Sequence, residues 1–177
     1  MAQPPVDEPT EVGSLLLAGR VPWGITALPG GSLVVPCEDK SVSVLDETGR
    51  RVAAWRAADR FSAPATVSLG AQPRIAFPQI TGRIDVCAWD AVTQTLAAEF
   101  SLTHGSEATA TAWGPGKTLV AAWKDGHLEA WSQGHLRWMA EAGTPVSWLL
   151  FDHGNGVYVA ARDKVILYDE SGRTAGQ

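Results

Sequence analysis

The chain has 177 residues, of which 45% are hydrophobic and 19% are charged, and its formal net charge is −5. This length suffices for one substantial domain with its own core, and the balance of residue types excludes a disordered polyelectrolyte. The negative charge gives no electrostatic basis for binding nucleic acid or an anionic membrane, so we expect neither partner. Eight tryptophans, 18 glycines and 11 prolines indicate short strands that carry large flat side chains between many turns.

The first segment, 1–12, is rich in proline and acidic residues, and we expect it to be a disordered leader before a folded domain over 13–177. It lacks the basic start and long apolar run of a secretory signal, and no run in the chain is long enough to span a bilayer. Cys37 and Cys87 stand in apolar surroundings without a spaced pair, which favours reduced, packed thiols and a cytoplasmic location. The excess of Arg over Lys, with abundant Ala and Gly, suggests a bacterial source.

Four segments end in the same way, with apolar residues two and four positions before the last residue: 41–46, 85–90, 127–132 and 164–169. Alternation with a period of two is typical of strands that bury one face. An apolar strand and a tight turn precede each segment, at 33–36, 75–78, 119–122 and 157–160. A further strand precedes each pair, at 25–29, 65–69, 108–113 and 146–151. A fourth strand follows in three units, at 52–56, 96–100 and 136–140.

Units of four antiparallel strands that recur about every 40 residues predict an all-β fold, a β-propeller of four blades. We place these blades at about 24–57, 65–102, 108–142 and 145–177. The last segment after Asp169 is too polar and short to predict an outer strand, so we expect residues 13–20 to complete the fourth blade. A small closed ring and a half-propeller both fit, and a half-propeller with apolar ends would pair with a copy of itself or with another propeller half.

The strand that ends at Trp89-Asp90 resembles the WD-repeat propellers, with Leu45-Asp46, Trp131-Ser132 and Tyr168-Asp169 as degenerate copies. The resemblance covers about residues 13–170, although the family's Gly-His dipeptide before the inner strand is absent. Quinoprotein-type propellers, which end strands much as 46–49 does, are the second resemblance. The resemblance to WD repeats implies a set of structural repeat positions: Asp39, Asp46, Trp89, Asp90, Asp125, Trp131, Asp163, Tyr168 and Asp169. Trp89, Trp131 and the inner-strand Trp113 and Trp148 are expected to pack between blades.

No pattern in the chain predicts catalysis, a metal or a cofactor. Gly116-Lys117-Thr118 lacks the earlier glycine of a phosphate-binding loop and is followed by a strand, which favours a turn. The four histidines show no ligand spacing, and we interpret them as surface or turn residues: His104, His127, His135 and His153. A non-enzymatic protein is therefore expected.

The resemblance to WD repeats also implies where a partner would bind. In such propellers the residue before the turn Asp points to the rim of the top face, and here its charge varies between Glu38, Lys124 and Arg162. The loops that enter the blades share this face and carry Trp23, Phe61 and His104. We therefore expect a protein-interaction scaffold that binds a protein partner with these six residues. Alternatives are a quinoprotein-like or glycan-binding propeller, the propeller part of a bacterial signalling or defence system, and a fragment of a longer protein.

Overall fold

The computed structural model describes residues 20–152 and 156–176, which form four antiparallel sheets of four strands each. The first sheet contains β1 (Thr26–Ala27), β2 (Leu33–Pro36), β3 (Ser41–Leu45) and β4 (Arg51–Arg56). The second contains β5 (Thr66–Val67), β6 (Arg74–Pro78), β7 (Arg83–Asp90) and β8 (Thr95–Thr103). The third contains β9 (Ala108–Gly114), β10 (Thr118–Trp123), β11 (His127–Ser132) and β12 (His135–Glu141), with a 3-10 turn at Pro115–Lys117. The fourth contains β13 (Val146–Phe151), β14 (Val157–Ala161), β15 (Lys164–Tyr168) and β16 (Thr174–Gly176). The predicted all-β class of four four-stranded units is confirmed.

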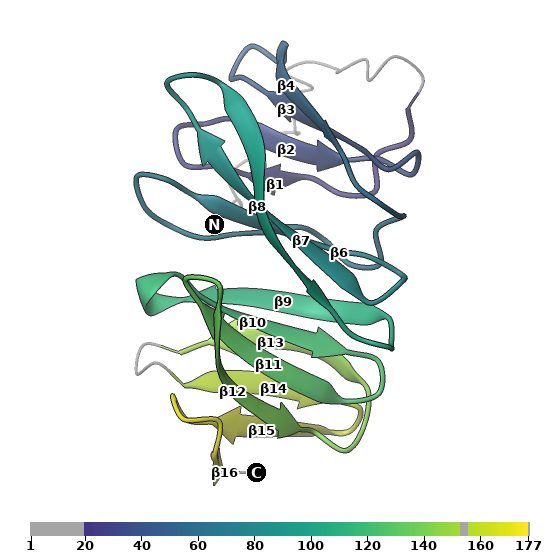
Figure 1. Ribbon diagram of the computed structural model, residues 1–177, viewed down its shortest axis with the longest axis vertical. Helices are drawn as coiled ribbons and strands as arrows, with labels where there is room; N and C mark the ends of the chain where they lie inside the picture. Colours follow the sequence, from purple (N-terminus) through teal and green to yellow (C-terminus); the bar gives the residue numbers. More distant parts are fainter. Residues whose placement is uncertain (1–19, 153–155, 177) are drawn as a thin grey trace, which may run out of the picture.

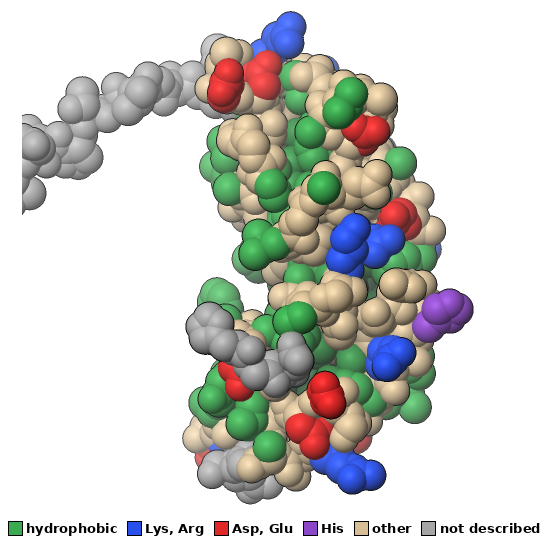
Figure 2. Space-filling model, turned by 90° about the vertical axis from the view of Figure 1, so that its left-hand side faces the viewer, with side chains coloured by type: hydrophobic (Ala, Val, Ile, Leu, Met, Phe, Trp, Pro, Cys, Tyr) green, Lys and Arg blue, Asp and Glu red, His purple; other side chains and the backbone are tan. Residues whose placement is uncertain are grey.

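The four sheets stack one after another in chain order. The first sheet lies at one end of the molecule and the fourth at the other (Figure 1). In the perpendicular view the stack is a crescent with one hollowed side (Figure 2). Of the two arrangements that the sequence allows, the described residues therefore adopt the open array and not the closed ring.

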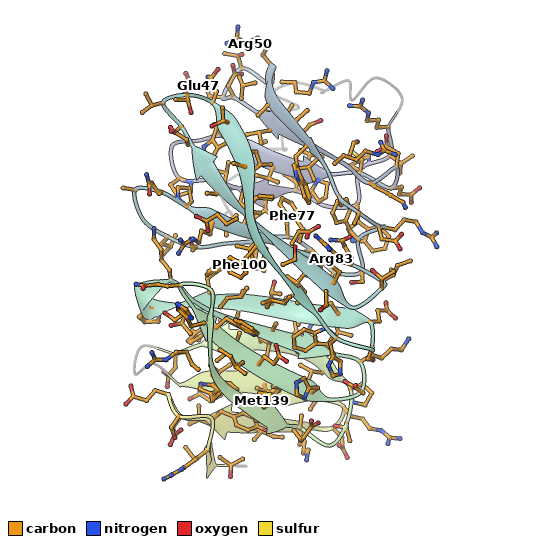
Figure 3. All side chains as sticks on the ribbon, in the orientation of Figure 1. Glu47, Arg50, Phe77, Arg83, Phe100 and Met139 are labelled. Carbon is orange, nitrogen blue, oxygen red and sulfur yellow. The ribbon has the colours of Figure 1, made fainter. Side chains whose placement is uncertain are left out.

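Three clusters of the core lie between neighbouring sheets, and a smaller one, of Val35, Cys37 and Leu45, lies on the first sheet alone. Val34, Phe77 and Trp89 belong to the cluster between the first two sheets. The next two clusters contain Ile84, Leu119 and Trp123, and Val120, Leu128 and Tyr168. Each such side chain contributes about 1.5–3 kcal/mol by leaving water. Phe77 points into the molecule, whereas Glu47 and Arg50 lie at the tip of the β3–β4 turn (Figure 3).

The aspartates that end three of the repeated strands hold the turns that follow them. The carboxylates of Asp46, Asp90 and Asp169 each accept a hydrogen bond from the backbone N–H two residues later, at 3.0, 2.8 and 2.8 Å. Such turns satisfy backbone donors where the chain reverses. The turns after Asp46 and Asp169 are alike, because each carboxylate also accepts from the N–H four residues later, whereas Asp90 accepts from the N–H three residues later.

The expectation for the outer strand of the fourth sheet is wrong. β16 forms within the polar C-terminal segment and pairs with β15, so that Leu167 faces Gly176 and Tyr168 faces Thr174. An edge strand is held through backbone hydrogen bonds, and these require no apolar side chains. Residues 13–19, which we expected at this edge, lie outside the described residues.

The tryptophans in the predicted packing positions divide into buried and exposed ones. Trp89 is 2% exposed, and Trp113 and Trp131 are partly buried between the second and third sheets. Trp148, however, is 72% exposed, which corrects its predicted packing role. Its side of the fourth sheet faces outward, because none of the other described sheets packs against that side. None of the described helical segments is long and apolar enough to cross a membrane.

Candidate functional site

The top face of the array is formed by the β2–β3, β6–β7, β10–β11 and β14–β15 turns and by the loops that enter the sheets. Backbone hydrogen bonds join the first three turns to their entering loops: the N–H of Glu38 donates to Val21 O and that of Lys124 to Glu107 O, both at 2.9 Å, and that of Ile80 donates to Arg60 O at 3.0 Å. The side chains of Glu38, Lys124 and Arg162 are exposed. The charged side chains that differ from one blade to the next therefore lie on a rim where the backbone arrangement recurs.

Three of the six predicted partner-binding residues line one cavity of about 350 Å³ on this face, together with Arg60 and Ile80. Trp23 is 46% exposed and Glu38 is exposed, so both are available to a partner. Phe61 is only 3% exposed, because its ring packs on Phe77 with centroids 6.0 Å apart. Phe61 is thus a wall of the cavity and part of the core.

The other three predicted residues lie elsewhere along the rim. Lys124 forms an ion pair with Glu107, with Nζ 3.0 Å from Oε2. Arg162 lines a separate hollow on the fourth sheet with Pro145, Val146 and Ser147. His104 belongs to a cluster between the second and third sheets, which is described next. The six predicted residues therefore do not come together in a single site.

Two histidines that we interpreted as surface or turn residues meet between the second and third sheets. The rings of His104, from the β8–β9 loop, and His127, the first residue of β11, stack with centroids 4.5 Å apart and 7° between planes. The buried Trp123 ring lies against both, at 5.1 and 5.6 Å. The two histidine side chains are 27% and 15% exposed.

Carboxylates surround this histidine pair. Nε2 of His104 lies 2.7 Å from Asp125 Oδ2. His127 contacts Glu141 Oε1 with Nδ1 at 2.8 Å and Glu129 Oε1 with Nε2 at 3.1 Å. The other oxygen of Glu129 accepts a hydrogen bond from Trp131 Nε1 at 2.7 Å.

The contacts alter the ionisation of two of these groups. Burial acts to raise the pKa of Asp125, but the hydrogen bond from His104 and that from the backbone of His127 outweigh it and lower the pKa. Burial acts to lower the pKa of His127, but the hydrogen bonds to Glu141 and Glu129 outweigh it and raise the pKa. The site thus combines imidazoles with an excess of negative charge.

Part of this cluster has a signal in the sequence. His127, Glu129 and Trp131 alternate along one strand, so they share a face. His104 comes from a loop 23 positions earlier, and only the packing of the second sheet on the third brings it to His127. No spacing rule for metal ligands would have joined them.

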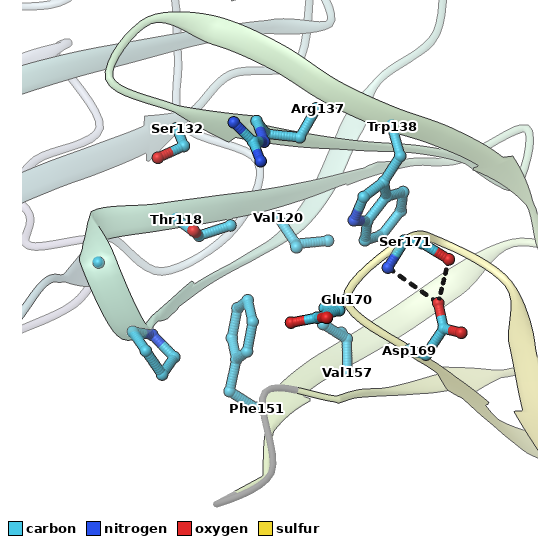
Figure 4. Close-up of a pocket in the computed structure, with 12 residues that line it drawn as sticks. Thr118, Val120, Ser132, Arg137, Trp138, Phe151, Val157, Asp169, Glu170 and Ser171 are labelled. Atoms are coloured by element: carbon cyan, nitrogen blue, oxygen red, sulfur yellow. Dashed lines mark hydrogen bonds between the residues drawn. The ribbon is translucent and has the colours of Figure 1, made fainter.

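A second cavity, of about 710 Å³, lies between the third and fourth sheets at the opposite end of their strands (Figure 4). The rings of Trp138 and Phe151 line it, together with the charged side chains of Arg137 and Glu170. The carboxylate of Asp169, at the edge of the cavity, accepts hydrogen bonds from Ser171 within its own turn (Figure 4). The cavity offers aromatic faces and opposite charges to a polar ligand.

The outward face of the fourth sheet is apolar. Trp148 and Leu150 on β13 are 72% and 66% exposed, and Tyr158 and Val165 on the next strands are 38% and 55% exposed. Cross-strand pairing places Leu150 opposite Tyr158 and Ala160 opposite Val165, which aligns these side chains on one face. We call these four residues the end face.

Comparison with known proteins identifies the fold and no family. No family model and no curated protein matches the chain. The fold is similar to that of the computationally designed Ika4 protein, with 20% identity and a TM-score of 0.69 over 92% of this chain and 99% of that one. It is also similar to BBS1N, in a mercury-soaked crystal structure with ARL6DN, with 14% identity and a TM-score of 0.67. That match covers 86% of this chain and 52% of BBS1N, so the chain spans about half the length of BBS1N. At these identities the likeness concerns the fold alone, and it supports a β-propeller-like fold.

Proposed function

We propose that this chain is a non-catalytic protein-interaction module of the WD-repeat type, a half-propeller that pairs with a second copy of itself. The end face carries the proposal, because four large apolar side chains on one sheet face are costly to leave in water. The crescent shape and the match to about half of BBS1N favour a propeller half as the occupant. A second copy joined at this end would cover the exposed outward face of the fourth sheet.

Light scattering of the purified chain tests this pairing. We expect twice the chain mass, and Trp148→Arg should reduce it to the mass of one chain, because a charged side chain would be buried without a partner. Leu69→Arg is the matched control, since Leu69 is 86% exposed in the β5–β6 loop and outside the end face. A wild-type chain that stays at monomer mass at high micromolar concentration contradicts the pairing, as does a Trp148→Arg variant that stays dimeric.

The top-face rim is then the surface for a different protein partner. Its cavity is lined by the aromatic side chain of Trp23 and by the opposite charges of Glu38 and Arg60. Aromatic anchors in pockets carry a large share of binding energy at protein interfaces. The variation of charge along the rim supports selection of one partner over others.

A ligand-binding propeller is the second candidate, and the cavity beside Trp138 favours it. Titration of the chain with sugars, followed by tryptophan fluorescence, separates the two functions. A saturable change that is lost in Trp138→Phe supports ligand binding, whereas no response supports the interaction module.

A further inference from the structure

We propose that His104, His127 and Glu129 form a site for a divalent transition metal ion of the zinc type. One donor atom from each residue lies within 4.8 Å of the other two. Two imidazoles and a carboxylate are ligands that zinc takes readily in proteins. This inference does not depend on the pairing of propeller halves or on the rim.

One distance at His127 is close to the separation of two ligands on one metal ion. Its Nε2 lies 3.1 Å from Glu129 Oε1. Zinc binds such atoms at about 2.0–2.2 Å, so two ligands of a tetrahedral ion lie roughly 3.3–3.5 Å apart. An ion between these two atoms needs little movement of β11, which carries both residues.

His104 is the ligand that must adjust. Its Nε2 is bonded to Asp125, so Nδ1 is the nitrogen that it offers to an ion. Because its ring is stacked nearly parallel to that of His127, an ion lying in the plane of both rings requires one ring to turn. His104 lies in the β8–β9 loop, outside the strand ladders, so this turn disturbs no strand pairing.

Each of the three ligands is held from its other side. Asp125 contacts His104, Glu141 contacts His127, and Trp131 donates to Glu129. Partners of this kind orient metal ligands and raise the basicity of histidine. A chance meeting of polar side chains would not require an outer partner for every ligand.

The charge and access of the site also suit a cation. Three carboxylates lie around the histidine pair, and the neighbouring Lys124 is already paired with Glu107. The side chains of His104, His127 and Glu129 are 27%, 15% and 13% exposed, so an ion can enter from solvent. Three protein ligands leave a fourth position on zinc for water or for a group of a partner.

Zinc titration of the tag-free chain, after dialysis against a chelator, tests the site. We expect calorimetry to give one saturable zinc ion per chain, and cobalt(II) to give the visible absorption of a four-coordinate site. His127→Gln and Glu129→Gln should abolish this binding. Glu141→Gln, which alters only the outer partner of His127, should weaken it about 10–100-fold.

His135→Gln is the control, because His135 is exposed at the start of β12 and outside the cluster. It should bind zinc as the wild type does. Near-ultraviolet circular dichroism of each variant confirms that the fold is kept, and Glu141→Gln provides a readout that leaves all three ligands in place. The site is disproved by a wild-type chain that takes up no zinc, or by ligand variants that bind it as tightly as the wild type.

Discussion

His127 lies between Glu129 and Glu141, with the ring of His104 stacked on it and Asp125 beyond that ring. Because its pKa is raised above the ordinary value of 6.5, the charged form stabilises the folded chain. This stabilisation is complete below about pH 6.5 and is lost as the pH rises through the folded-state pKa. We therefore predict that the imidazole proton signal of His127 titrates above 6.5 in metal-free buffer.

Proton NMR measures this midpoint, and Glu141→Gln should lower it because one of the two charged partners is lost. In the wild type, unfolding free energy should fall as the pH rises above 6.5, and His127→Gln should flatten this fall. A midpoint at or below 6.5 would show that burial of the ring outweighs its carboxylates.

The sequence predicts the location of the candidate site residues only in part. Trp23 precedes the first blade and Glu38 lies within it, and these positions predict that both residues lie on one face. In the structure they line one cavity. Phe61 was assigned to the same face, but its ring also belongs to the core, and a single sequence does not separate these roles. The pairing of His104 with His127 depends on how two sheets pack, which strand periodicity does not contain.

At the scale of the element, the β6–β7 turn contacts the loop that enters the third sheet. Gly82 in this turn has φ +81, and an added Cβ would lie 2.2 Å from the carbonyl oxygens of His104 and Ser106. We predict that Gly82→Ala lowers the free energy of unfolding by several kcal/mol, about 3–5, because a backbone clash is added to left-handed strain. Denaturant unfolding measures this loss.

Gly134 in the β11–β12 turn provides the matched control. It has φ +79, but no heavy atom lies within 4 Å of an added Cβ. Gly134→Ala should therefore cost only the backbone strain, about 1–2 kcal/mol. Equal losses in the two variants would mean that the turn moves away from the loop at little cost.

Strands with alternating apolar residues were predictable because each needs only its own pattern and one buried face. β16 was not, since its pairing with β15 uses backbone groups and its side chains carry no apolar signal. The prediction that Trp148 packs between blades is wrong for a different reason. Its strand has the pattern of the other inner strands, and only the position of the fourth sheet at the end of the array exposes it.

At the scale of the whole molecule, the core is a series of clusters between neighbouring sheets, so each internal sheet is stabilised from both sides. An array of this kind gains stability sheet by sheet, and its ends contribute least unless something covers them. The outer side of the fourth sheet carries Trp148 and Leu150 in contact with water. Pairing with a second copy would therefore stabilise the terminal sheet and the fold together.

This coupling predicts that the thermal unfolding midpoint of the wild type rises with protein concentration. Association that occurs only in the folded state adds stability by mass action, which for a homodimer amounts to about 0.7 kcal/mol per chain for each tenfold increase in concentration. For a chain of this length each 1 kcal/mol shifts the midpoint by about 2–4 °C. Scanning calorimetry over a hundredfold range of concentration should therefore resolve the shift.

Trp148→Arg should remove the concentration dependence, and its midpoint should lie at or below that of the most dilute wild type. Leu69→Arg should keep the dependence, because it adds the same charge away from the end face. A midpoint that is independent of concentration in the wild type would mean that the end face is not closed by a second copy. A concentration-independent midpoint together with a monomer mass would indicate that a different protein binds the end face. Co-purification, with Trp148→Arg as the negative control, would then identify that protein.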